Sequence, residues 1–96
     1  MFRFIIPTLS ALLFVASCSN PPASRAVVTG ANPELLKLRG GPGLDYNVIL
    51  GLPDGTVVLR RECITEVGEL WCRVSLASAP GLTGFVAARY LSEARI

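Results

Sequence analysis

The amino-acid sequence predicts an all-β protein: a small barrel of five to six short strands that follows a cleaved signal peptide. From Arg25 onward there is no convincing helical pattern, and short apolar runs alternate with turns that contain glycine and proline. Their spacing of roughly 8–12 residues is typical of small sandwiches and barrels. The 96 residues leave room for one domain, of which the first stretch is not a part. The hydrophobic content of 51% is high for a soluble protein because of residues 4–15, which contain no charge.

Residues 1–17 are expected to form a lipoprotein signal peptide. Arg3 supplies the positive charge of the first region, and residues 4–15 form an apolar run interrupted by Pro7, Thr8 and Ser10. A membrane-spanning helix is the alternative, and it needs about 20 apolar residues. The stretch from Phe4 to Ala16 has only 13 residues, which favours a signal peptide.

Val15-Ala-Ser-Cys18 resembles the lipobox of bacterial lipoproteins, in which small residues precede a cysteine. The resemblance implies cleavage before Cys18 and lipidation of its thiol. Two or three acyl chains would then hold the protein stably on a membrane. In Gram-negative lipoproteins, a residue such as Ser19 after the cysteine favours the outer membrane, with the domain facing the periplasm. Ordinary secretion, with cleavage near Ala16 or Ala23, remains the alternative.

Residues 18–25 are expected to be the lipidated cysteine and a flexible tether, because Ser19-Asn-Pro-Pro-Ala-Ser24 is polar and rich in proline. Residues 26–94 are the predicted barrel. Its strands are expected at residues 26–29, 35–39, 46–50, 56–63, 70–76 and 84–87, with a closing turn or short strand at 89–91. In the second of these, Leu36 and Leu38 share one side and Lys37 takes the other. Residues 64–69 and 77–83 are expected to be loops.

With Cys18 assigned to lipid, Cys63 and Cys72 remain as a pair, which an oxidising compartment allows to form a disulfide. The alternation of side chains supports this pairing. Val57, Leu59 and Cys63 are expected on one face of their strand, with Arg61 as a misfit. Leu70, Cys72, Val74 and Leu76 are expected on one face of the next strand, and a Cys63–Cys72 bond points both apolar faces to the same side. Two alternatives are weaker, because two cysteines without histidine cannot complete a zinc site and a redox pair is usually Cys-x-x-Cys.

Leu36-Lys-Leu-Arg-Gly-Gly-Pro-Gly43 resembles the Leu-Asn-Val-Arg-Ser-Gly-Pro-Gly signature of bacterial SH3 domains. The resemblance covers nearly all of residues 26–92, and the motifs that follow keep the family order: Tyr46, Val48-Ile49, Leu52-Pro-Asp-Gly-Thr56, Trp71-Cys-Arg-Val74, Gly84-Phe-Val86 and Tyr90-Leu91. It implies an SH3-like barrel, and family members often carry the same cysteine pair. Lys37, Gly40 and Phe85 depart from the usual Asn, Ser and Trp, and residues 32–34 and 77–80 look like insertions.

The sequence gives no sign of an active site, so we expect no enzyme activity and no cofactor. Histidine is absent, which removes the commonest general base and the commonest metal ligand. Ser75 has no base to activate it, and Asp45 and Asp54 lie in turns, where aspartate usually serves the backbone. A net charge of +2 without a basic stripe does not indicate a nucleic-acid partner.

Four side chains are the candidate ligand-binding residues: Tyr46, Trp71, Arg73 and Tyr90. Opposite an inward disulfide, Trp71 and Arg73 would lie on the outer face beside Arg60 and Glu62. Tryptophan and arginine are enriched at binding hot spots. In the alternative interpretation, Trp71 packs beneath the 77–83 loop as part of the core. The resemblance places Tyr46 and Tyr90 beside a groove, while Phe85 is expected to be mostly structural.

These expectations describe a non-catalytic module held in the cell envelope by acyl chains on Cys18. Bacterial SH3 domains in the envelope commonly recognise cell-wall peptide or glycan, or hold a partner near peptidoglycan, so the resemblance implies such a role here. A periplasmic protein–protein adaptor or inhibitor is the alternative, because edge strands can pair with an extended segment of a partner.

Overall fold

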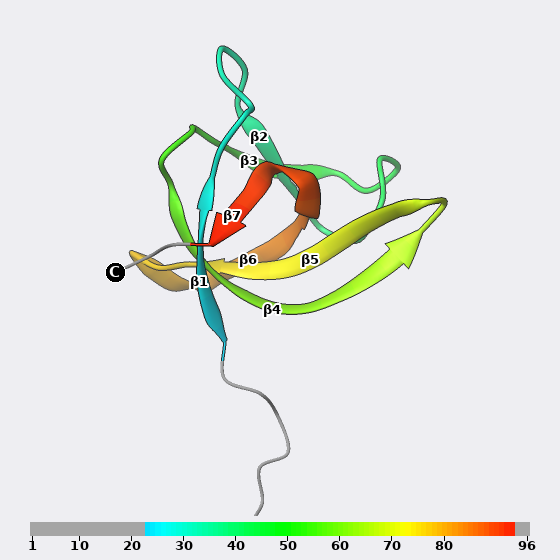
Figure 1. Cartoon of the computed structure of the whole chain (residues 1–96). Coiled ribbons are helices and arrows are strands. Elements are labelled where there is room, and N and C mark those ends of the chain that lie inside the picture. Colours follow the sequence, from blue (N-terminus) through cyan, green and yellow to red (C-terminus); the bar gives the residue numbers. More distant parts are fainter. Residues whose placement is uncertain (1–22, 94–96) are drawn as a thin grey trace, which may run out of the picture.

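A computed structural model describes residues 23–93, which fold into seven β-strands and one short 3-10 helix, with no α-helix in this range (Figure 1). The all-β class predicted from the sequence is therefore confirmed, with seven strands within residues 23–93 rather than five to six. In chain order the elements are β1 (Ser24–Val28), β2 (Leu36–Arg39), β3 (Val48–Leu52), β4 (Val57–Glu66), β5 (Glu69–Leu76), β6 (Ala79–Ala87), the 3-10 helix η1 (Ala88–Tyr90) and β7 (Leu91–Glu93).

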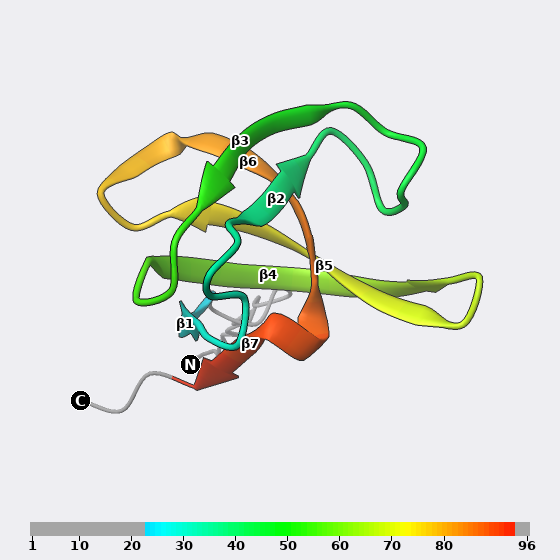
Figure 2. The ribbon, with the colours of Figure 1, turned by 90° about the horizontal axis from the view of Figure 1, so that it is seen from above.

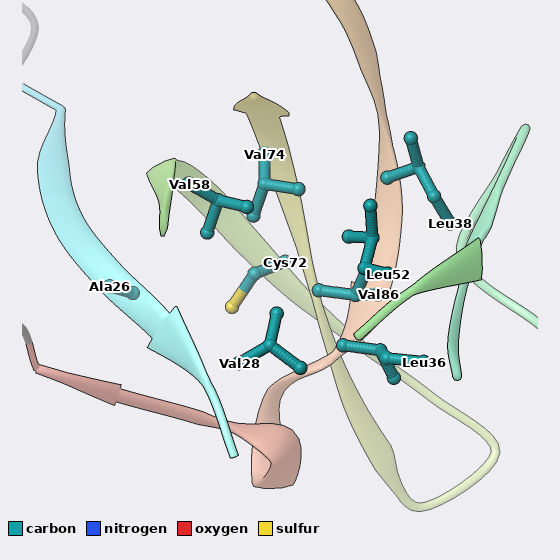
Figure 3. Packing of buried hydrophobic residues seen from close by; sticks show 9 residues of the cluster. All are labelled: Ala26, Val28, Leu36, Leu38, Leu52, Val58, Cys72, Val74 and Val86. Atoms are coloured by element: carbon teal, nitrogen blue, oxygen red, sulfur yellow. The ribbon is translucent and has the colours of Figure 1, made fainter. Parts of the chain in front are cut away.

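The strands form one antiparallel sheet in the order β3-β2-β6-β5-β4-β1-β7, which curls into a half-barrel with β3 and β7 at its edges (Figures 1 and 2). The curl encloses one apolar core (Figure 3). Leu36 and Leu38 of β2 point into it while Lys37 is exposed, as the alternation predicts. The core cluster comprises Ala26, Val28, Leu36, Leu38, Leu52, Val58, Cys72, Val74 and Val86.

The predicted signal peptide (residues 1–17), the lipidated Cys18 and most of the tether (18–25) lie outside the described residues. Strand β1 begins at Ser24, two residues before the first strand expected at 26–29. Ser24 and Arg25 pair with Arg60 and Leu59 of β4, so the sheet extends into the last residues of the expected tether. In residues 23–93, no helix is long and apolar enough to cross a membrane.

Two connections are tighter than predicted. The loop expected at 64–69 is a two-residue turn, Val67-Gly68, and the loop expected at 77–83 is a turn at residues 77–78. In the second case, Pro80 and Gly81 favour a loop in the sequence, yet the backbone stays extended as the start of β6. Proline is compatible with extended backbone where strand pairing is irregular, and the register between β5 and β6 shifts at this end.

The disulfide between Cys63 and Cys72 is confirmed, because their sulfur atoms lie at bonding distance and the two residues face each other in the β4–β5 ladder. The predicted facing of β4 is wrong in its first half. Val58 is fully buried, whereas Val57 and Leu59 are only partly buried. A bulge between Arg60 and Cys63 explains this, because one extra residue reverses the alternation before the cysteine.

The bulge also separates the arginines of β4. Arg60 pairs with Val74 and reaches Glu93 at 3.5 Å, so it lies away from the Trp71 face on which it was predicted. Arg61 donates from Nε to Oγ of the buried Ser75 at 3.0 Å. Ser75 is thus a hydrogen-bonded structural residue, as a buried hydroxyl requires.

Candidate binding groove

Two adjoining hollows share Trp71, Leu44 and Glu69 in their walls, and together we call them the groove. The first, the η1 hollow, has a volume of about 330 Å³ and includes Leu35, Lys37, Arg89 and Tyr90. The second, the loop hollow, has a volume of about 480 Å³ and includes Asp45, Tyr46, Glu66 and Val67. Both volumes fall within the range of about 300–1,000 Å³ that is typical of small-ligand sites.

The walls of the loop hollow come from two projections, the loop at residues 40–47 and the tip of the β4–β5 hairpin. Both project on the same side of the molecule (Figure 2). The base of the loop is closed by the Gly40 N–H, which donates to the Asn47 carbonyl at 3.0 Å. Arg39 holds the interior of the loop, because its Nη1 donates to the carbonyls of Leu44 and Tyr46 at 3.3 and 3.1 Å.

Trp71 forms the shared wall of the two hollows, although it is only 5% exposed. It is therefore not the open surface residue that the sequence suggested. It also does not lie beneath residues 77–83, because it pairs with Ile64 and Ala87, at the opposite end of β5 from that turn. The Trp71 side chain is packed, as the core interpretation predicted, and it also lines the groove, as the binding interpretation predicted.

The two tyrosines lie in different hollows. Tyr46 is 48% exposed and lines the loop hollow, where its ring packs over Gly41 and Gly43. Tyr90 is partly buried, packs against the core and lines the η1 hollow. The Tyr90 carbonyl accepts from the Thr29 N–H at 2.8 Å, and the Arg89 guanidinium carbon lies 5.1 Å from the Tyr90 ring centre. The groove thus has an aromatic side chain in each hollow and Trp71 between them.

Arg73, the fourth predicted binding residue, lies outside both hollows and already has a partner. Its Nε and Nη2 donate to the two carboxylate oxygens of Glu62 at 2.6 and 3.2 Å. This forked hydrogen bond lowers the pKa of the Glu62 carboxyl below its ordinary value of 4.5 and raises the pKa of Arg73. The pair bridges β4 and β5 beside the bulge, which indicates a structural role for Arg73.

Sequence reasoning missed several residues that line the groove. Leu44 is 75% exposed, lines both hollows and lies at the end of the glycine-rich turn. Leu35, Lys37, Glu69 and Arg89 come from three other segments. A leucine directly after the glycine-rich turn Gly40-Gly-Pro-Gly43 was a sequence signal that could have suggested Leu44. The others are ordinary strand or turn residues that only the fold brings together.

The described residues offer polar contacts for a ligand and no assembled set of metal ligands: within 23–93, no three Cys, Asp or Glu side chains gather as such a set. Asp54, as expected for a turn aspartate, accepts from the backbone N–H groups of Gly30 and Ala31 at 3.2 and 3.0 Å. A groove with aromatic walls, an exposed leucine and charges of both signs is suited to hold an extended ligand that has apolar and charged parts.

Comparison with protein-family models, with curated proteins and with solved structures gives no significant match.

Proposed function

We propose that this chain is a lipid-anchored binding module of the bacterial SH3 type, which recognises cell-wall peptide or glycan in the cell envelope. The observation that carries the proposal is the shared position of Trp71 between two hollows that also contain Tyr46 and Tyr90. Stacking and apolar contact on such side chains suit a peptide backbone or a sugar ring. The resemblance of residues 36–43 to the bacterial SH3 signature supports the same assignment.

The proposed location in the cell envelope depends on lipidation of Cys18 and is supported by the disulfide. A bridge such as Cys63–Cys72 forms and persists in oxidising compartments, which include the bacterial periplasm. Lipidation at Cys18 would then retain the exported domain on a membrane, with the outer membrane favoured by Ser19. A Cys18→Ala variant should move from the membrane fraction to the soluble periplasmic fraction, and its retention on membranes would contradict the anchor.

Binding can be tested by co-sedimentation of the purified, oxidised protein with peptidoglycan. Leu44→Ala removes an exposed side chain common to both hollows, and Leu70→Ala is a matched control at a leucine that is 46% exposed and lines neither. We expect saturable pelleting that Leu44→Ala weakens and Leu70→Ala leaves unchanged. Trp71 is a poor first choice, because truncating so buried a side chain typically costs about 3–5 kcal/mol of stability. No pelleting of the folded wild type would reject the proposal.

A second candidate function, a protein–protein adaptor, is supported by the edge strand β3. Val48 and Ile49 are 44% and 41% exposed, and residues 46–53 contain no charge. Natural edge strands usually carry charges that prevent pairing, so an uncharged edge is suited to accept an extended strand from a partner. Ile49→Lys should then abolish capture of a periplasmic protein while leaving peptidoglycan sedimentation intact.

A further inference from the structure

The charges of the two hollows differ in sign. Asp45, Glu66 and Glu69 line the loop hollow, and among the residues described no lysine or arginine does so. Within residues 23–93, neither Asp45 nor Glu66 forms an ion pair with a basic side chain. Both carboxylates therefore remain free to meet a cation that enters beside Tyr46 and Val67.

The η1 hollow contains the basic side chains. Lys37 is exposed and, within the part of the chain that the structure describes, has no carboxylate partner. Arg89 is 65% exposed, and its Nε lies 3.6 Å from the Glu69 carboxylate. Arg39 is less free to meet a ligand, because its Nη1 holds the loop carbonyls. Lys37 and Arg89 give this hollow its positive charge. Among the residues that the structure describes, Glu34 is the one carboxylate that lines this hollow and not the other.

Apart from Glu69, the region that the two hollows share is apolar. Trp71 and Leu44 line both hollows, and Glu69, which also lines both, is paired with Arg89. A ligand that spans the groove would thus meet Asp45 and Glu66 at one end, an aromatic and aliphatic wall in the middle, and Lys37 with Arg89 at the other. Opposite potentials at the two ends fix the direction in which a charged ligand lies.

We propose that the groove selects a short zwitterionic peptide, with its ammonium group in the loop hollow at Asp45 and Glu66 and its carboxylate in the η1 hollow at Lys37 and Arg89. The inference rests on the proposed function and narrows its ligand class. A neutral glycan carries neither charge, whereas a cell-wall peptide with a free amine and free carboxylates carries both.

The probe is a soluble cell-wall stem peptide in three forms: with free ends, with its amine acetylated, and with its carboxylates amidated. Titration calorimetry at low salt measures the affinity of the full chain for each form. We expect acetylation and amidation each to weaken binding about threefold to fivefold, the upper part of the range for exposed ion pairs, and added salt to reduce both effects.

Charge-removing variants assign each end to one hollow. Glu66→Gln should weaken binding of the free peptide but leave binding of the acetylated peptide unchanged, because the ammonium is already absent. Lys37→Gln should weaken binding of the free peptide but leave binding of the amidated peptide unchanged, because the carboxylates are already absent. Glu93→Gln and Arg25→Gln, at residues outside both hollows, are the matched controls and should bind as the wild type does.

The outcomes separate this inference from the function on which it rests. Equal affinity for all three peptide forms would overturn the zwitterionic ligand while leaving a groove that binds peptide. Sedimentation with peptidoglycan but no affinity for any peptide form would also overturn it and indicate a glycan. Failure to bind both peptide and peptidoglycan would reject the proposed function itself. Weakening by acetylation that persists in Glu66→Gln would place the ammonium elsewhere and overturn the assigned direction.

Discussion

The ring of Tyr46 lies directly against Gly41, so closely that a Cβ atom at position 41 would overlap the ring carbons Cγ, Cδ1 and Cε1. Gly41 is buried beneath the ring, and the carbonyl of Tyr46 accepts a hydrogen bond from Nη1 of Arg39 at 3.1 Å. The position of Tyr46, the most exposed aromatic side chain in the groove, therefore depends on the absence of a side chain at Gly41.

Gly41→Ala should displace the Tyr46 ring from the loop hollow. Because Tyr46 is about half exposed and can rotate outward, we expect the free energy of unfolding to fall by less than about 1 kcal/mol, the low end for overpacking, while affinity for peptidoglycan falls several-fold. Gly43→Ala is the control, since its Cβ would meet the same ring at an ordinary distance of 3.5 Å. Sedimentation and thermal unfolding of both variants measure the effect, and equal affinity in the two would contradict it.

The tip of the β4–β5 hairpin should be stabilised by replacing Val67. Val67 has a φ of 51° and Gly68 a φ of 78°, which are the left-handed values of a two-residue hairpin turn in which Asn-Gly is preferred. A β-branched residue in this region costs about 1–2 kcal/mol. Val67→Asn should therefore raise the free energy of unfolding by about 1 kcal/mol and the Tm by about 4–8 °C.

Thermal unfolding of Val67→Asn beside Val67→Thr checks this prediction. Threonine keeps the branched Cβ, so that variant should unfold near the wild-type temperature. A Tm for Val67→Asn that does not exceed that of Val67→Thr would show that the backbone of Val67 is not strained. Since Val67 lines the loop hollow, a gain in stability with a loss of affinity would also indicate that its side chain serves binding.

The sequence predicted the hairpin but not its shape, and Val67 illustrates why. Valine favours strands, and Gly68 alone marked the turn, so residues 64–69 suggested a longer loop. The tight turn arises because Thr65 and Leu70, and then Glu66 and Glu69, continue the ladder that the disulfide begins. Tertiary and cross-strand pairing here override local propensity.

The disulfide should contribute substantially to stability. Cys63 and Cys72 are nine residues apart, and closing a loop of about ten residues is worth about 2.5–3 kcal/mol on the chain-entropy model. Denaturant unfolding of the oxidised protein should therefore have a clearly higher midpoint than unfolding after reduction. The double variant Cys63→Ser/Cys72→Ala should match the reduced protein, and identical midpoints with and without a reducing agent would contradict the prediction.

The Glu62–Arg73 pair predicts a loss of stability in acid. Because hydrogen bonding to Arg73 lowers the pKa of Glu62 in the folded state below its ordinary value of 4.5, the folded state binds fewer protons than the unfolded state. The contribution of the pair is fully present above the unfolded pKa and is lost as pH falls through the folded pKa. Thermal unfolding between about pH 6 and pH 2 should show a smaller acid-induced decrease in Glu62→Gln than in the wild type. Identical pH dependence in both proteins would exclude this role.

The site was less predictable than the fold for a related reason. Alternation and turn residues predicted β2 and its facing, because those depend on neighbours along the chain. Arg60 was placed on the wrong face because one unpredicted bulge residue reverses the alternation of β4. The partner of Arg73 could be suggested, since Glu62 was expected on the same face. The proximity of Lys37 and Arg89 could not be predicted from the sequence, because only the curl of the sheet brings them into one hollow.

The bond between Cys63 and Cys72 makes the hairpin tip a covalently closed ring that includes Glu66, Val67, Glu69 and Trp71. Residues 61–68 of this hairpin are all exposed, so its turn is an accessible site for a protease. A single cut at the turn would open the chain without separating its two pieces, because the Cys63–Cys72 bond would still join them. The hairpin wall of the groove would therefore stay covalently connected after a single cleavage. Denaturing electrophoresis would show two fragments only after reduction of the disulfide.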